Sequence, residues 1–331
     1  MNAKQLVWNL TGLALAGLLA VVLGLGALPG QAMAFPDKPI QLIVPWSAGG
    51  GSDRSMRLVA DAATKKLGVP VIVINKPGAG GAVGTQAIAS AKPDGYTIGM
   101  VGSGVIARHY ANPNANKFTD LEPLVFFGAD PAALSARTDL GFKNVSDFLN
   151  YAKKNPGKIK NGNDSPGGAS YIAIAVIEKS LGIKVIRVPY KGYSPTVAAL
   201  LAGEVDTATV PVPDAIEHHK AGKIRILAVA GQSRHFIAPD VPTFKEQGYD
   251  LIIGSWRTIV APKGVPRDRF RILEAKLMET LKDSEFVGRA NTAGFAVSPM
   301  GSRETSGFWT SYDKSLYPVL LESGLVKVRK K

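Results

Sequence analysis

Cysteine is absent from the 331-residue sequence, and acidic residues are few beside basic ones. Without cysteine the chain cannot form disulfides, Cys-ligated zinc sites, iron–sulfur clusters or thiol nucleophiles. Lys and Arg number 39 against 26 Asp and Glu, so the net charge is +13, and 46% of the residues are hydrophobic. That hydrophobic content argues against disorder, and the length predicts about two domains. Any function must come from oxygen, nitrogen and backbone groups.

Residues 1–34 have the pattern of a secretory signal peptide. Lys4 is the only charge before Asp37, an apolar run covers residues 13–23, and the triplet Ala32-Met33-Ala34 follows. A basic start, a short apolar middle and an A-x-A site predict cleavage after Ala34. The alternative is a membrane anchor, which needs about 20 apolar residues. We therefore expect an exported protein of the bacterial periplasm, without the cysteine that a lipoprotein anchor requires.

Short apolar runs alternate with helical patterns along the rest of the chain. Runs that are nearly continuous in apolar residues are typical of strands covered by helices on both faces, so the alternation predicts an α/β protein with a parallel sheet. The patterns predict strands at 40–44, 71–75, 96–101, 185–188 and 224–229, and helices at 54–66, 86–91, 146–155, 194–201, 214–221, 270–281 and 308–321.

Glycine-rich turns follow the first three predicted strands. They cover residues 45–53, 76–84 and 102–104. In a parallel sheet these turns share the carboxyl edge, where ligands bind. Glycines let the backbone approach a ligand, and the unpaired N–H groups at the start of each following helix favour an anion. One such turn could be simple tight-turn geometry, but three together predict a cleft for a small anion.

Motifs for nucleotides, metals and catalysis are not found. Val83 stands where the dinucleotide fingerprint needs a third glycine, and no Gly-Lys pair precedes Ser or Thr. No G-x-S-x-G elbow surrounds the candidate serines. The four histidines include no i,i+4 ligand pair, and Asp214 and Glu217 are explained by capping at a helix start. We therefore expect a binding protein rather than an enzyme, with no catalytic residue and no metal.

Asp53 and Arg54 stand at the end of the first glycine turn. A carboxylate would repel an anionic ligand, so we expect Asp53 to shape the loop by accepting N–H bonds at the start of its helix. Arg54 is either a counter-charge for the ligand or a solvated helix residue.

Several sequence segments carry a family resemblance, and they run in family order across the mature chain. They are 35–40, 44–50 with Asp53, 75–81, 92–97, 188–192, 221–223, 239–243, and Trp256 with 261–262. At these segments the chain resembles the periplasmic substrate-binding receptors of tripartite tricarboxylate transporters, also called Bug receptors.

The resemblance implies a two-lobed α/β fold of the periplasmic binding protein type, a type II-like Venus flytrap with a ligand cleft between the lobes. The chain should cross between lobes near Ala132 and Ser255. Residues 35–132 and 256–331 would then form lobe 1, and residues 133–255 would form lobe 2.

The resemblance also implies a function. A small organic carboxylate (a di- or tricarboxylate, an aromatic acid or an acidic amino acid) would be held by backbone N–H groups, hydroxyls and waters, with no cofactor, and delivered to the membrane subunits of a tripartite transporter. A receptor feeding a sensor kinase is an alternative, and a periplasmic enzyme using the same cleft is a weaker one. We expect a monomer. Nucleic acid is not an expected partner, because no aromatic residue interleaves the charges of the basic tail at 326–331.

Two departures from the family pattern concern the ligand. Trp46 replaces the usual Phe or Tyr and should narrow or reshape the cleft floor. The second-lobe glycine loop, usually similar to G-S-S-G-N-G-S with a following His, is here residues 161–170, in which Asp164 could recognise an amine or hydroxyl of the ligand. Carried over position by position, the implied ligand contacts are Trp46, Ser47, Ala48, Gly50, Gly80, Gly81 and Ser103 in lobe 1, and Ser165, Gly168, Ser170, Tyr190 and Asp206 in lobe 2.

Overall fold

The computed structural model describes residues 35–112, 115–322 and 324–327. The predicted signal peptide and most of the basic tail lie outside these residues. Residues 1–37 and 38–331 form separate units, and the following description concerns the second unit.

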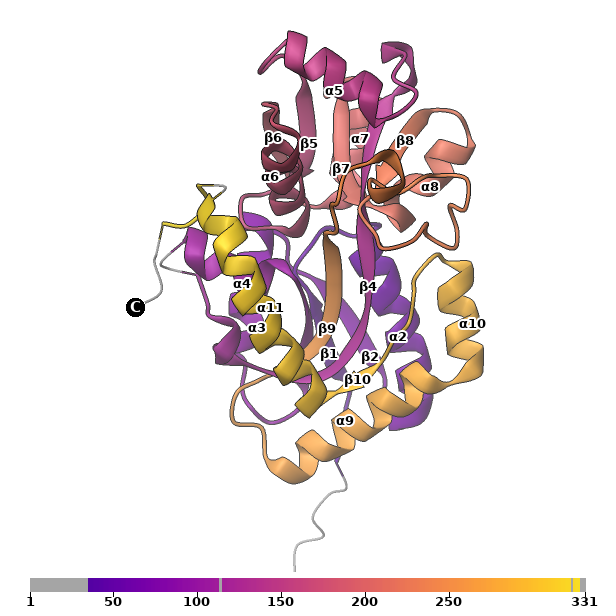
Figure 1. The fold of residues 1–331 in the computed structure, drawn as a ribbon. Coiled ribbons are helices and arrows are strands. Elements are labelled where there is room, and N and C mark those ends of the chain that lie inside the picture. The colour runs from indigo at the N-terminus through magenta and orange to yellow at the C-terminus, as the bar shows by residue number, and fades with distance from the viewer. Residues whose placement is uncertain (1–34, 113–114, 323, 328–331) are drawn as a thin grey trace, which may run out of the picture. The chain divides into compact units, whose positions relative to one another are not determined.

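A 10-stranded mixed sheet runs through this unit in the order β2-β1-β3-β9-β4-β7-β5-β6, with β8 and β10 also pairing with β4 (Figure 1). The strands are β1 Ile40–Val44, β2 Val71–Asn75, β3 Thr97–Gly102, β4 Leu121–Arg137, β5 Lys160–Asp164, β6 Ile186–Tyr190, β7 Thr207–Pro211, β8 Ile224–Val229, β9 Gly254–Pro262 and β10 Met300–Gly301.

Parallel pairing is confirmed for β1–β3 and for β5–β7, but β4 and β9 pair antiparallel to their neighbours. The prediction of a parallel sheet is therefore wrong at these two strands. The sequence patterns missed β4, β7, β9 and β10, and they also missed β5, because its residues are polar. Asn161 is fully buried there and donates to the hydroxyl oxygens of Thr207 and Thr209 on β7, so side-chain hydrogen bonds replace apolar packing.

Strand β4 belongs to both halves of the sheet. Its residues as far as Pro131 pair with β9, and those from Ala132 pair with β7. We call the half built on β1–β3 and β9 lobe 1, and the half built on β5–β8 lobe 2. The change of partner lies beside the predicted crossing at Ala132, and β9 begins beside the predicted crossing at Ser255. The domain boundaries themselves stay a prediction.

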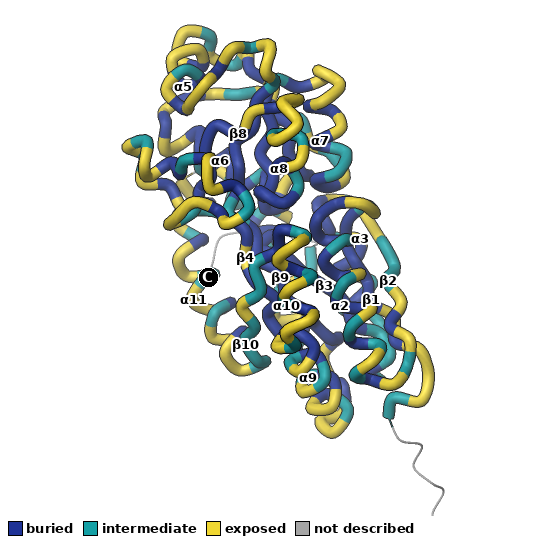
Figure 2. The backbone as a smooth tube through the Cα atoms, turned by 90° about the vertical axis from the view of Figure 1, so that its right-hand side faces the viewer, coloured by how far each residue is buried: buried dark blue, intermediate teal, exposed yellow. Residues whose placement is uncertain are grey.

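The helices pack on the faces of these two halves, with exposed residues on their outer sides (Figure 2). Phe270, Leu273, Leu277 and Leu281 are all buried, as their spacing predicts. The α-helices are α2 Gly51–Leu67, α3 Ala82–Ala89, α4 Gly104–Ala111, α5 Val145–Lys154, α6 Ala169–Leu181, α7 Tyr193–Leu201, α8 Val212–Lys220, α9 Arg267–Lys282, α10 Ser284–Thr292 and α11 Ser302–Glu322.

A buried ion pair joins β4 and β9 next to the change of partner. The Arg257 guanidinium donates to Asp130, and both side chains are almost fully buried. Burial raises the pKa of Asp130, but the charge of Arg257, the nearby His235 with Nε2 3.7 Å from Oδ1, and the hydrogen bond from Arg257 outweigh this effect and hold the pKa below its usual range. The pair therefore ties the two long strands where lobe 1 ends.

Gly254 makes this close approach of the strands possible, because a Cβ added there would lie 2.2 Å from the Asp130 carbonyl oxygen. We expect Gly254→Ala to lower the free energy of unfolding by about 1–3 kcal/mol, since overpacking would push β9 away from β4. Urea unfolding measures the change. Gly288→Ala is the control: Gly288 lies inside α10 and a Cβ there meets nothing within 4 Å. Equal stability of the two variants would contradict the prediction.

Candidate functional site

The turn between β1 and α2 is held by Asp53. Its carboxylate accepts the Gly49 N–H at 2.9 Å, the Arg57 Nε at 3.0 Å and the Asn75 amide at 3.0 Å. Burial raises the pKa of Asp53, but these hydrogen bonds outweigh it and leave the pKa below its ordinary value. The loop-shaping role stays a prediction, and these contacts support it.

The same turn meets lobe 2. The Ser47 hydroxyl donates to the Lys191 carbonyl oxygen at 3.1 Å. The Gly51 N–H donates to Asp214 Oδ1 at 2.6 Å, and Arg54 Nη2 donates to the Pro213 carbonyl oxygen at 2.7 Å. The start of α2 in lobe 1 therefore faces the turn after β6 and the start of α8 in lobe 2.

Asp214 corrects the sequence interpretation. It was expected to cap its own helix, but α8 begins at Val212 and Pro211 is its N-cap residue. Asp214 instead accepts a hydrogen bond from the first residue of α2, one of the N–H groups that a helix cannot satisfy internally.

The second glycine turn meets the loop after β5. Gly80 has a φ of +63°, and a Cβ added there would lie 3.2 Å from the Ser165 carbonyl oxygen. A Cβ added at Gly81, which has a φ of +89°, would lie 3.2 Å from Trp46 Cζ2 and 3.3 Å from Arg108 Nη2. Glycine is required at both positions by the backbone conformation and by these neighbours.

The loop after β5 is organised around Asp164. Its N–H donates to Ser170 Oγ at 2.7 Å, and its Oδ1 accepts the Tyr171 N–H at 2.9 Å. A Cβ at Gly168, the N-cap residue of α6, would lie 2.3 Å from Asp164 Cγ. The carboxyl group of Asp164 therefore sits against the N-terminus of α6, where a bound anion would otherwise be expected.

The other predicted contacts divide into two groups. Ala48 is exposed, and Gly50 is buried as the N-cap residue of α2, so both lie in the first turn. Ser103 is 1% exposed and precedes α4, and its hydroxyl lies 3.4 Å from the Gly254 carbonyl oxygen. Ser165 donates to the Tyr190 carbonyl oxygen at 3.2 Å. These residues lie at the edges where the two lobes meet.

Tyr190 and Asp206 point elsewhere. The Tyr190 hydroxyl donates to Glu204 at 3.2 Å. Asp206 accepts the Lys160 N–H at 2.9 Å and lies 3.8 Å from Arg137. Because β5 and β7 are parallel, with Asn161 opposite Thr207, Asp206 lies at the amino end of these strands and Asp164 at the carboxyl end. The structure does not bring Asp206 together with the predicted cleft residues.

Arg108 is the main site residue that the sequence analysis missed. It lies on α4, is 3% exposed, and donates through Nη1 to Thr85 Oγ1 at 2.9 Å. A Cβ at Gly167 in lobe 2 would lie 3.1 Å from Arg108 Cγ. Burial lowers the pKa of Arg108 to about 10, with the charge of Asp164 opposing the shift. The sequence pattern that could have pointed to it is an arginine one helical turn after Gly104, directly following the apolar residues 105–107.

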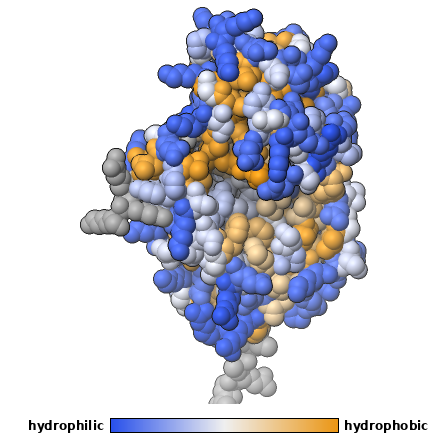
Figure 3. Space-filling model, viewed as in Figure 1, coloured by the Kyte–Doolittle hydropathy of each residue, from blue (hydrophilic) through white to orange (hydrophobic). Residues whose placement is uncertain are grey.

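A cavity of about 760 Å³ lies outside this cluster, lined by residues of α11 and of the segments 129–131, 230–236 and 252–256. None of the predicted ligand contacts lines it. On the face of the molecule that Figure 3 shows, hydrophobic residues gather around a hollow near the middle. Within the described ranges, no three His, Asp or Glu side chains group closely enough to hold a metal ion, and no helix is long and apolar enough to span a membrane.

Comparison with solved structures defines the class of the fold as a two-lobed periplasmic binding protein. The structure of the periplasmic binding protein BugD superposes with a TM-score of 0.84 at 31% identity, covering 88% of this chain and 99% of that one. MatC from Rhodopseudomonas palustris, solved with bound malate, superposes with a TM-score of 0.80 at 25% identity, covering 86% of this chain and 100% of MatC.

Sequence comparison gives the family. Residues 55–324 match the family model described as tripartite tricarboxylate transporter family receptor. The "UPF0065 protein in gbd 5'region" of Cupriavidus necator is 34% identical over 326 residues, which cover 96% of this chain and 98% of that protein. The chain belongs to this receptor family, as its sequence segments predict.

Burial of Asp164 predicts a pH dependence. Burial raises the pKa of its carboxyl group to about 6, although the hydrogen bond from the Tyr171 N–H and the nearby Ser170 oppose the shift. The folded chain then holds this proton more tightly than the unfolded chain, so stability should fall as the pH rises from about 4 to about 6. Asp164→Asn removes this contribution. We expect the stability of the variant relative to the natural chain to increase by up to about 3 kcal/mol between pH 4 and pH 7.

Chemical unfolding of both proteins at each pH measures this change. Asp250→Asn is the control, because Asp250 is an exposed residue in the segment before β9. A stability difference between the Asp164 variant and the natural chain that does not change with pH would contradict the prediction.

Proposed function

We propose that this chain captures a small organic carboxylate between its two lobes and delivers it to the membrane subunits of a tripartite tricarboxylate transporter. The observation that carries the proposal is the meeting of a glycine turn of lobe 1 with a loop of lobe 2: Gly80 lies against Ser165 and Pro166, and Gly81 beside it lies against Trp46 and Arg108. Family membership and the malate bound to the related MatC support a carboxylate as the ligand.

The proposed ligand contacts come from the turn at 46–50, from Gly80, Gly81 and Ser103, and from the loop at 164–170. In this region the glycine turns and serines supply backbone N–H groups and hydroxyls, which suit a carboxylate, whereas the starts of α2 and α6 already donate to Asp214 and Asp164. We propose that the chain crosses between lobes near Ala132 and Ser255, so that the lobes close on the ligand about a hinge. Closure responds to a ligand only when the ligand contacts both lobes.

We further propose that the protein is exported to the periplasm and that its signal peptide is cleaved after Ala34. The receptor family and the order of charge, apolar run and small residues at the N-terminus support this location. The mature N-terminus of the protein purified from periplasmic extract, read by mass spectrometry, should begin at Phe35.

A thermal-shift screen tests the ligand class. Di- and tricarboxylates, aromatic acids and acidic amino acids are compared with neutral sugars and polyols of similar size. A ligand present at about 100 times its dissociation constant should stabilise the protein by about 2.7 kcal/mol. A shift produced by a neutral solute while no carboxylate has an effect would refute the proposal.

Closure can be tested separately at Gly104. A Cβ there would lie 2.6 Å from the Gly167 carbonyl oxygen in lobe 2. Gly104→Ala should hold the lobes apart and weaken carboxylate binding about tenfold or more, since overpacking costs about 1–3 kcal/mol. Calorimetry with the carboxylate that gives the largest thermal shift measures the effect. Gly307→Ala on α11, where a Cβ meets nothing within 4 Å, is the control and should bind as the natural chain does. Unchanged affinity in the Gly104 variant would speak against closure at this contact.

A further inference from the structure

Buried polar atoms without a hydrogen-bond partner gather where the loops of the two lobes meet. In the described part of the chain, Nε and Nη2 of Arg108, Nε1 of Trp46 and Oδ2 of Asp164 have no partner. The three residues are 3%, 8% and 0% exposed. Native proteins leave few buried polar groups unpaired, because each loses its hydrogen bonds to water without replacement. Such a cluster of unpaired groups points to a partner that the chain itself does not supply.

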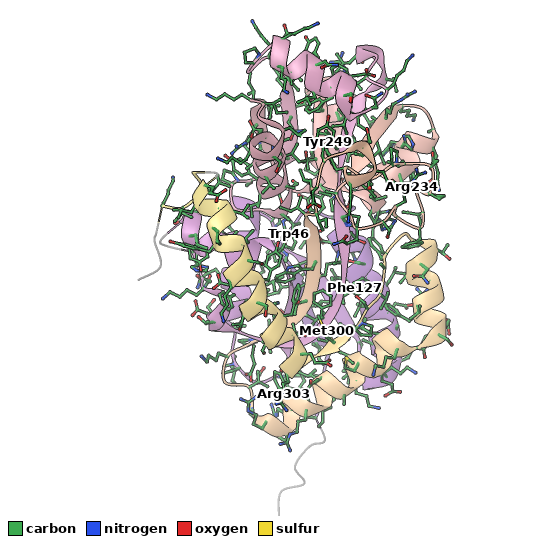
Figure 4. All side chains as sticks on the ribbon, in the orientation of Figure 1. Trp46, Phe127, Arg234, Tyr249, Met300 and Arg303 are labelled. Atoms are coloured by element: carbon green, nitrogen blue, oxygen red, sulfur yellow. The ribbon has the colours of Figure 1, made fainter. Side chains whose placement is uncertain are left out.

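Two of these groups are donors that converge on Gly81. A Cβ at Gly81 would lie 3.3 Å from Arg108 Nη2 and 3.3 Å from Trp46 Cε2, the ring carbon bonded to Nε1. A guanidinium and an indole N–H donate hydrogen bonds but accept none. A carboxylate oxygen is the matching partner, and its bond to Arg108 would be charge-assisted. Figure 4 shows Trp46 near the middle of the molecule, away from its outer ends.

Arg108 is not committed to a structural ion pair. Among the described residues, the hydrogen-bond partner of its guanidinium is the neutral hydroxyl of Thr85, and Nε and Nη2 have none. The ion pairs within 4.0 Å in the described ranges do not include Arg108, although Asp164 is close enough to influence its charge. A buried guanidinium with a free edge is therefore available to an anion that enters between the lobes.

Asp164 offers the opposite chemistry from lobe 2. One carboxyl oxygen accepts the Tyr171 N–H at the start of α6, and the other has no partner in the described chain. The N-terminus of α6 is thus already occupied by a carboxyl group of the protein. A second carboxylate of a ligand would be repelled there, whereas an N–H or O–H group would be accepted.

We propose that the ligand of this protein carries a hydrogen-bond donor in addition to its carboxylate, so that it is a hydroxy- or amino-carboxylate. Arg108 and Trp46 hold the carboxylate, and Asp164 accepts the hydroxyl or amino group. This inference rests on the proposed function and narrows its ligand class.

The test compares carboxylates that differ only in the donor. Succinate is compared with malate and aspartate, and benzoate with 4-hydroxybenzoate, by isothermal titration calorimetry at pH 7.5 on the mature chain. We expect at least one donor-bearing acid to bind at least tenfold more tightly than its matched acid without the donor.

Asp164→Asn separates recognition from folding. The variant should bind the donor-bearing acid at least fivefold more weakly and the matched plain acid more tightly, because the negative charge that attracts one and repels the other is gone. A purely structural role of Asp164 would weaken both acids together.

Arg108→Gln should weaken every bound carboxylate at least tenfold, and Arg108→Lys should restore part of the affinity. Arg303→Gln is the matched control. Arg303 is an exposed arginine on α11, and Figure 4 shows it at the end of the molecule far from Trp46. The melting temperature of each variant without ligand shows whether it folds.

The outcomes are distinct. Binding of the plain and donor-bearing acids within twofold of each other, or Arg108→Gln binding as the natural chain does, would overturn the inference and leave the proposed function standing. If none of these five acids binds and no carboxylate in the thermal-shift screen raises the melting temperature, both the inference and the proposed function are wrong.

Discussion

The arrangement of this molecule depends on one strand that hydrogen-bonds with both halves of the sheet. Strand β4 pairs with β9 as far as Pro131 and with β7 and β8 beyond it. Its buried backbone N–H and C=O groups need hydrogen-bond partners along its whole length, so β4 stays paired with strands of both halves. The Arg257–Asp130 pair and the bare backbone of Gly254 keep β9 beside it. Because both halves of the sheet share β4, the turns after the parallel strands of lobe 1 meet the turns after the parallel strands of lobe 2.

Where the two lobes meet, groups of opposite charge lie close together. Lobe 1 contributes glycine turns and the buried guanidinium of Arg108, and lobe 2 contributes the buried carboxyl groups of Asp164 and Asp214. The first N–H of α2 donates to one oxygen of Asp214, and the Tyr171 N–H donates to one oxygen of Asp164, while the second oxygen of each has no partner in the described residues. The same lobe contact therefore contains polar interactions that join the lobes and polar atoms that remain unpaired.

Sequence patterns predicted much of the fold because buried strands appear as apolar runs and buried helix faces as apolar residues at helical spacing. Strands β1, β2 and β8 begin and end as predicted, and the buried leucines of α9 have helical spacing. Strand β5 was missed because Asn161 is buried through hydrogen bonds rather than through an apolar side chain. Asp206 lies apart from the other candidate contacts, at the amino end of its strand, because spacing along the chain does not tell which end of a strand faces the other lobe.

By itself, the sequence determined the receptor family, the α/β class and the positions of the glycine turns, since each depends on residues close together in the chain. Only the tertiary structure decided that Arg108 lies beside Trp46 and Gly81, and that Asp164 occupies the start of α6. These neighbours come from separate strands and helices. The positions of these two charges are therefore set by how the lobes pack, which no local sequence pattern records.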